Sequence, residues 1–507
     1  MGAIERSIHD LYEHGESRLG HLWPVWIVGV FFYAAVSYVL LTRVALPSPL
    51  HFFVYTMGAA IVVLTVLNVE WAVLGLVTMT PFARPGMSFG PEKVFHLSGF
   101  NFALAGVLFV YALRYFTDRG FASKGPFVRR TPIDRVMFAF LLLVTFSAMI
   151  GLATNELEVA RTRLLLYYKE QVLYVAWFYL LVTLLRKPSD IRRFAIFFAI
   201  SGLLVSLLGL YNRVTGAVAG ATATAAELEA GAVGGQTAGG WLGLAHPNFF
   251  AAFLLLSFPI WFFIVDYLRR AGQKVFAYVA ILVGFLGLLF TYSRSAWGGT
   301  LAGLGILGLG DRRALVRILI FLVLFAVVAQ TASVALTGMG VVDLVRLRFE
   351  QLGRSQYSGR FLIYSVALGL INDHPLTGVG LGAYPWHGQG AWEGARNVQA
   401  HNLFLTLAAE QGLVVTALFA ALVVVIFVMA TRNLIALRHD PGYGFLARAS
   451  YVGLVAIMTQ SLFVHIFYHR DVGYAFYAML AIVVSLNRMV REGLLPETGA
   501  AARPRRV

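Results

Sequence analysis

The sequence predicts an all-α, polytopic integral membrane protein with about 12–14 transmembrane helices and one large extracytoplasmic loop before the last three spans. Hydrophobic residues make up 59% of its 507 residues, charged residues only 13%, and the mean hydropathy is +0.75. Soluble domains are about half apolar and about a quarter charged. Apolar runs long enough to cross about 30 Å of hydrocarbon recur along the chain, which distinguishes this protein from one with an ordinary buried core.

Fourteen apolar runs are candidate spans. In chain order they are 24–41, 51–67, 71–82, 97–116, 135–153, 170–186, 191–212, 248–266, 274–290, 295–310, 314–337, 412–430, 446–465 and 471–489. Run 71–82 is short for a span, so the number is predicted as a range. Run 24–41 is interpreted as a retained anchor rather than a cleaved signal peptide, because mixed charges precede it and no small-residue cleavage pattern follows.

Basic residues set the predicted orientation, because an excess of Lys and Arg marks cytoplasmic loops. With fourteen spans, both termini lie on the same side as the basic residues of the short loops, among them Arg119, Lys124, Arg129, Arg130, Arg186, Arg192, Arg269, Arg270, Arg312, Arg313, Arg432 and Arg438. This bias explains the net charge of +15 without a nucleic-acid partner, and an anionic substrate would be a second contributor. The absence of cysteine excludes thiol catalysis, iron–sulfur clusters, cysteine-ligated zinc and disulfides.

The predicted organisation is a transmembrane bundle (1–337), the large loop (338–411), C-terminal transmembrane helices (412–489) and a basic cytoplasmic tail (490–507). A loop this long is usually functional or disordered, and its tryptophans and tyrosines argue against disorder. Five arginines of this loop lie on the predicted outer side, against the trend that places basic residues in the cytoplasm: Arg346, Arg348, Arg354, Arg360 and Arg396. We therefore expect much of the chemistry in this loop.

Arg294 lies in a tight junction between two spans, in the segment 291–297 (Thr-Tyr-Ser-Arg-Ser-Ala-Trp). A charge near hydrocarbon depth is costly and usually functional. The alternative is an arginine that reaches the lipid headgroups. The short junction leaves Arg294 little freedom to reach the headgroups, and this favours a functional role. Tyr292 lies beside Arg294 in the same segment.

Arg360 opens a second segment, 358–364, which has helical periodicity and contains Tyr364. Glycines at 378, 380 and 382 follow shortly afterwards. Glycines allow close approach of backbone to a ligand and can present N–H groups to an anion, although turn geometry alone would also explain them.

His401 and Asn402 directly precede an apolar run, so His401 is predicted at a helix N-terminus on the outer face. The positive end of the helix dipole disfavours an imidazolium ion, and a neutral imidazole is what a general base requires near pH 7. The alternative is a structural or capping histidine.

Together these residues indicate transfer from a phosphate leaving group to a hydroxyl, because arginine's planar fork suits phosphate oxygens and a histidine can take the hydroxyl proton. We assign Arg294, Arg360 and His401 to catalysis, with no metal and no cofactor. Substrate binding is assigned to Arg346, Arg348, Arg354, Arg161, Arg163, Tyr292, Tyr364 and Asn402. Arg161 and Arg163 precede span 170–186 on the outer face, where anchoring the helix at the membrane surface is an equally good explanation for them. No Asp-x-Asp motif, P-loop or dinucleotide fingerprint is present, so a lipid diphosphate donor fits better than a nucleotide.

The three segments, in this order, resemble the O-antigen ligase and Wzy-type polymerase superfamily over about residues 290–430. The resemblance rests on 291–297, on 358–382 with its His-Pro-Leu-Thr-Gly-Val-Gly core, and on His401-Asn402 followed by Glu410-Gln-Gly412. It implies many helices, a large periplasmic loop and metal-independent, inverting glycosyl transfer from an undecaprenyl-diphosphate-linked glycan. It also implies a bacterial inner-membrane location with a periplasmic site, and maps the family's two arginines onto Arg294 and Arg360 and its histidine onto His401.

Two departures leave ligase and polymerase both open. The ligase pattern continues from His401 to Gly412, but Val415 stands where a second glycine is expected. A polymerase pattern, arginine followed by glycine eleven residues later, fails at Arg360, where Ile371 occupies the glycine position. The acceptor would be lipid A core in a ligase or a lipid-linked glycan in a polymerase, with polysaccharide assembly proteins as partners.

Two other classes of function are alternatives. A solute or ion transporter would be expected to bury carboxylates or histidines mid-membrane, and the predicted span centres are almost free of them. If the protein were a non-enzymatic sugar-binding membrane component, the presence of Arg294, Arg360 and His401 would have no explanation. We expect the site at the contact between the loop and the membrane helices, because Arg360 and His401 lie in the loop and Arg294 lies outside it.

Overall fold

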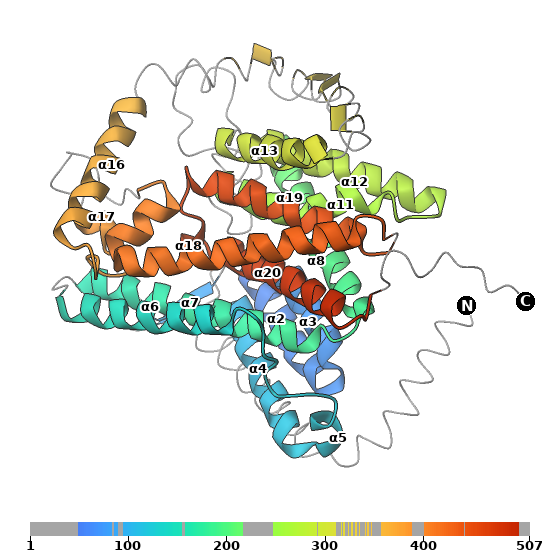
Figure 1. Ribbon diagram of the computed structural model, residues 1–507, viewed down its shortest axis with the longest axis horizontal. Helices are drawn as coiled ribbons and strands as arrows, with labels where there is room; N and C mark the ends of the chain where they lie inside the picture. Colours follow the sequence, from blue (N-terminus) through green and yellow to red (C-terminus); the bar gives the residue numbers. More distant parts are fainter. Residues whose placement is uncertain are drawn as a thin grey trace, which may run out of the picture.

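The protein is described by a computed structural model over residues 49–83, 86–89, 95–154, 158–215, 247–291, 293–310, 356–387, 400–440 and 442–495, with isolated residues between 316 and 346. Its helices are α2 (Pro49–Leu67), α3 (Val69–Met79), η1 (Thr80–Phe82), α4 (Gly99–Thr117), α5 (Arg119–Ala122), α6 (Asp134–Thr154), α7 (Glu158–Leu184), α8 (Pro188–Thr215), α10 (Pro247–Ser257), α11 (Pro259–Ile264), α12 (Ala271–Leu289), α13 (Arg294–Gly310), α16 (Gln356–Asp373), α17 (Tyr384–His387), α18 (Leu403–Leu437), α19 (Gly444–Ser461), η3 (Ile466–Tyr468) and α20 (Arg470–Arg491). One antiparallel hairpin, β1 (Gly86–Phe89) with β2 (Phe95–Ser98), interrupts this helical fold. The predicted all-α class is confirmed (Figure 1).

Seven helical segments among the described residues are long and apolar enough to cross a membrane: α4, α6, α8, α10 continued by α11, α12, α18 and α20. Each predicted run that lies fully within the described residues overlaps a helix, or two consecutive helices, over most of its length. Run 71–82 is divided between α3 and η1, and run 248–266 between α10 and α11, where Pro259 begins the second helix. Run 24–41 and most of 314–337 lie outside the described residues, as do residues 347–355 and 388–399 of the large loop and residues 496–507 of the tail.

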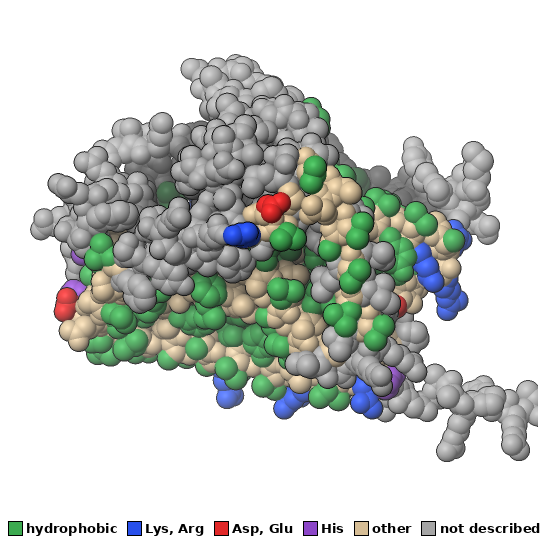
Figure 2. All heavy atoms as spheres, turned by 90° about the horizontal axis from the view of Figure 1, so that it is seen from above, with side chains coloured by type: hydrophobic (Ala, Val, Ile, Leu, Met, Phe, Trp, Pro, Cys, Tyr) green, Lys and Arg blue, Asp and Glu red, His purple; other side chains and the backbone are tan. Residues whose placement is uncertain are grey.

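The outer faces of the helices are apolar. On α6, Phe138, Leu142, Phe146 and Met149 recur at helical spacing and are between 57% and 69% exposed. Figure 2 shows hydrophobic side chains over most of the described surface on one face, with Lys and Arg side chains along its lower edge. An apolar belt of this kind is soluble only in lipid, so the protein is a polytopic membrane protein.

Packed helices run in the relative directions that alternating spans require. α2 and α4 are parallel: Gly99, at the start of α4, lies against Val54 in the first half of α2. Near their ends, Nη1 of Arg114 donates a hydrogen bond of 3.2 Å to the Thr65 carbonyl. α13 and α19 are antiparallel, because two glycines of α13 lie against α19 backbone in reversed order.

The starts of α4, α13, α18 and α20 and the end of α19 lie toward one end of the bundle, which we call the loop end. The Asn402 amide nitrogen donates to the Leu462 carbonyl at 3.0 Å, which joins α18 to the end of α19. The buried Glu170 carboxylate accepts hydrogen bonds from Asn101 (2.8 Å) and pairs with Nε of Arg470 (3.0 Å). A buried charge paired in this way fixes the starts of α4 and α20 against the middle of α7.

Candidate functional site

Arg294 is the first residue of α13, and its side chain is half-buried. The turn before it is fixed by hydrogen bonds to the α12 terminus: the Thr291 hydroxyl and the Trp297 indole both donate to the Leu288 carbonyl, at 2.6 and 3.2 Å. The Ser293 amide donates to the Thr291 hydroxyl at 3.2 Å. The junction is therefore as short as the sequence predicted, and Arg294 lies at the loop end.

Helix stability does not account for an arginine at this position. The N-terminus of a helix carries partial positive charge, which disfavours a cation and favours an anion. Arg294 and the first turn of α13 therefore both attract negative charge to the same place. Tyr292, predicted to bind substrate, lies outside the described residues.

The glycine-rich segment after α16 forms a turn, residues 376–384, that docks on α18, and we call it the glycine turn. The amides of Val379 and Gly380 donate to the carbonyls of Ala409 and Glu410, at 2.9 and 2.8 Å. The Gly382 amide donates to the Glu410 carboxylate at 2.9 Å. Of the three glycines only Gly382 donates its amide to an anion, and that anion is a side chain of the protein itself, so turn geometry is the explanation that the structure supports.

Gly412 breaks α18 at the point where the glycine turn docks. Its φ of 85° and ψ of 168° lie outside the helical region. The following amide, of Leu413, leaves the helix pattern and donates to the Pro375 carbonyl at 2.7 Å. The predicted span therefore begins at a kink, and the first section of α18, residues 403–411, is a separate segment at the loop end.

Alanine at Gly412 is expected to destabilise this docking, because its Cβ would lie 2.1 Å from the Leu376 carbonyl oxygen. The backbone conformation alone would cost about 1–3 kcal/mol. The matched control is Gly369→Ala in α16, where no atom lies within 4 Å of the new Cβ. A helical glycine-to-alanine change stabilises by about 0.5–1 kcal/mol. Thermal unfolding in detergent should move in opposite directions for the two variants, and equal midpoints would contradict the docking.

Arg360 lies in α16, which packs against the first section of α18 (Figure 1). The contact is a small apolar cluster centred on Ala367, Tyr384, Ala400 and Ala409. The side chain of Arg360 lies outside the described part of the chain, but its helix is placed at the loop end beside His401. Tyr364, on the same helix, is half-buried.

His401 precedes α18 with φ of 48°, the one positive φ of a residue other than glycine among the described residues. Such a conformation costs free energy and is concentrated at functional sites. The helix cap is Asn402, whose side-chain oxygen accepts from the Leu405 amide at 3.1 Å. A capping role therefore does not explain His401. Asn402, predicted to bind substrate, uses both polar atoms of its amide within the protein and thereby positions His401.

The remaining predicted binding residues are placed only in part. Arg161 is exposed on α7 near the loop end, and Arg346 is exposed. Arg163 lies on α7 with its side chain outside the described part, and Arg348 and Arg354 lie wholly outside it. The structure thus brings together the elements that carry Arg294, Arg360 and His401, and leaves the other assignments as predictions.

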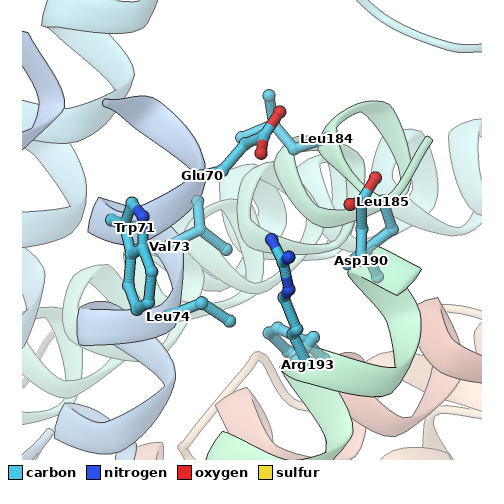
Figure 3. A pocket seen from close by; sticks show the side chains of 9 residues that line it. Glu70, Trp71, Val73, Leu74, Leu184, Leu185, Asp190 and Arg193 are labelled. Atoms are coloured by element: carbon cyan, nitrogen blue, oxygen red, sulfur yellow. The ribbon is translucent and has the colours of Figure 1, made fainter. Parts of the chain in front are cut away.

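A cavity at the opposite end of the bundle is separate from this site. It is lined by residues of α3, α7 and α8, and Figure 3 shows Arg193 extending between Glu70 and Asp190. The far end of α7 and the start of α8 form this cavity, so it lies away from the loop end.

Residues 279–420 match the O-antigen ligase family (Wzy_C). No curated protein matches the chain. The matched segment contains Arg294, Arg360, the glycine turn, His401 and Glu410, so the resemblance seen in the three sequence segments is confirmed there.

Proposed function

We propose that the protein is a membrane glycosyltransferase that transfers or polymerises glycan from an undecaprenyl-diphosphate-linked donor onto an acceptor hydroxyl. The reaction takes place at the periplasmic face of the bacterial inner membrane, with both termini in the cytoplasm. The observation that carries this proposal is the O-antigen ligase match over residues 279–420, the segment that contains Arg294, Arg360 and His401.

His401 acts as the general base. It takes the proton of the acceptor hydroxyl as that oxygen attacks the anomeric carbon, and the bond from this carbon to the diphosphate oxygen breaks. Attack from the side opposite the leaving group inverts the anomeric configuration. The glycan thereby moves to the acceptor, and the polyprenyl diphosphate leaves with the bonding electron pair.

Arg294 and Arg360 bind the donor diphosphate and stabilise the charge that develops as it departs. Guanidinium groups do this without a metal ion, because each offers a planar fork to phosphate oxygens. The first turn of α13 adds its own partial positive charge beside Arg294. The apolar belt of the bundle lets the polyprenyl chain remain in lipid while its diphosphate reaches the loop end.

The remaining assignments follow from this arrangement. The loop 338–411 supplies Arg360, His401 and the arginines Arg346, Arg348 and Arg354. The bundle 1–337 supplies Arg294. The helices 412–489 pack against this bundle and support the loop that carries the other site residues. Arg161, Arg163, Tyr292 and Tyr364 line the path of the glycan.

The test is reconstitution of the purified protein in liposomes with a polyprenyl-diphosphate glycan and either lipid A core or a second lipid-linked glycan. We expect transfer to one acceptor that persists in EDTA, with the product analysed by mass spectrometry and its anomeric configuration by NMR. The acceptor that is used separates ligase from polymerase. Movement of the glycan across the vesicle membrane without a new glycosidic bond would instead support a transporter.

A further inference from the structure

We infer that Glu410 is a positioning residue for glycan transfer, whose buried carboxylate sets the helix carrying Arg360 against the segment carrying His401. This inference rests on the proposed function and assigns a role to a residue that contacts neither donor nor acceptor.

Glu410 lies in the first section of α18 and is fully buried. Its carboxylate accepts hydrogen bonds from two backbone amides of the glycine turn, Gly382 at 2.9 Å and Tyr384 at 3.2 Å. Removing a carboxylate from water is costly unless donors replace the water, and these two amides do so. The charge therefore holds the glycine turn in one position on α18.

The glycine turn in turn holds α16. The Tyr384 hydroxyl donates to the Ile363 carbonyl at 2.7 Å, and Ile363 lies three residues after Arg360 on the same helix. Burial, with the nearby charge of Glu410, raises the pKa of Tyr384, so its hydroxyl remains protonated and available as the donor. Two hydrogen bonds thus link the Glu410 carboxylate to the α16 backbone beside Arg360.

The same carboxylate is rigidly connected to His401. The first section of α18 is short, is capped by Asn402 at its start and ends at the Gly412 kink. Both ends are tied to other parts of the protein, through the Leu462 carbonyl and the Pro375 carbonyl. A shift of the glycine turn therefore changes the placement of α16 relative to His401 and leaves this segment in place.

Catalysis is sensitive to such a shift, because a misplacement of about 1 Å can cost about 100-fold in rate. Glu410→Gln keeps the shape but replaces one oxygen with an N–H group that faces an amide donor. We expect a fall in kcat of about 10- to 100-fold with KM for the acceptor little changed. Tyr384→Phe, which removes only the link to Ile363, should lower kcat in the same way, and the double variant should be no slower than Glu410→Gln.

A second readout does not require activity. The chain has no cysteine, so spin labels can be placed at Leu368→Cys on α16 and Leu462→Cys after α19, both of which are exposed. The distance distribution between the labels should broaden or shift in Glu410→Gln and in Tyr384→Phe. Gly369→Ala is the control that leaves both the distance and kcat unchanged.

Unchanged distances together with kcat equal to that of the unaltered protein would overturn the inference. A lowered unfolding temperature with kcat per folded molecule intact would also overturn it, because Glu410 would then serve stability alone. If the unaltered protein transfers no glycan, the proposed function fails, and the distance measurement still decides whether Glu410 sets α16 against α18.

Discussion

Replacing His401 with asparagine should reduce glycan transfer by about 10²- to 10⁴-fold, the range that a positioned general base contributes. Asparagine is the suitable replacement because it tolerates the left-handed backbone conformation that His401 adopts, with φ of 48°. The backbone before α18 is then preserved while the base is lost. Binding of the lipid diphosphate donor should be little affected, since the arginines carry that interaction.

The measurement is transfer from the lipid diphosphate donor under single-turnover conditions, with donor binding determined separately. His439→Asn is the matched control, because His439 is exposed after the far end of α18, away from the loop end. Equal rates for the His401 and His439 variants would remove His401 from the mechanism. Loss of donor binding in the His401 variant would instead assign it to binding.

The helical spans could be predicted from the sequence because hydropathy is a local property. The placement of Arg294 could be predicted for the same reason, since the two flanking apolar runs leave only a few residues between them. The start of α18 was predicted from His401 and Asn402, which directly precede Leu403, but the kink at Gly412, where run 412–430 begins, was not. The break depends on the glycine turn that docks there, and that contact comes from another part of the chain.

The contacts that hold the site together could not be predicted. Glu410 receives its hydrogen bonds from residues 28 and 26 positions earlier in the chain, and nothing near Glu410 indicates those partners. The Glu170 carboxylate is paired with Arg470, which lies 300 residues away. The glycines at 378, 380 and 382 indicated a tight turn, but only the fold shows that the Gly382 amide binds an internal carboxylate.

Replacing Arg294 or Arg360 with alanine should lower kcat by about 10²- to 10³-fold, the loss that removal of one oxyanion-hole donor causes in acyl transfer. Lysine should restore only part of the rate, because it keeps the charge but loses the planar fork that binds two phosphate oxygens. Donor binding should weaken in both alanine variants and should become less dependent on salt, since a charge that salt screens has been removed.

Arg270→Ala is the matched control, because Arg270 precedes α12 at the end of the bundle away from the loop end and should retain full transfer. If both arginines act on the same diphosphate, the effects of the two alanine changes should not be additive in the double variant. Additive losses would place the two residues on different parts of the substrate. Near-normal transfer in the Arg294, Arg360 and His401 alanine variants would exclude this site altogether, and the arginine at the start of α13 would then act only as a membrane anchor.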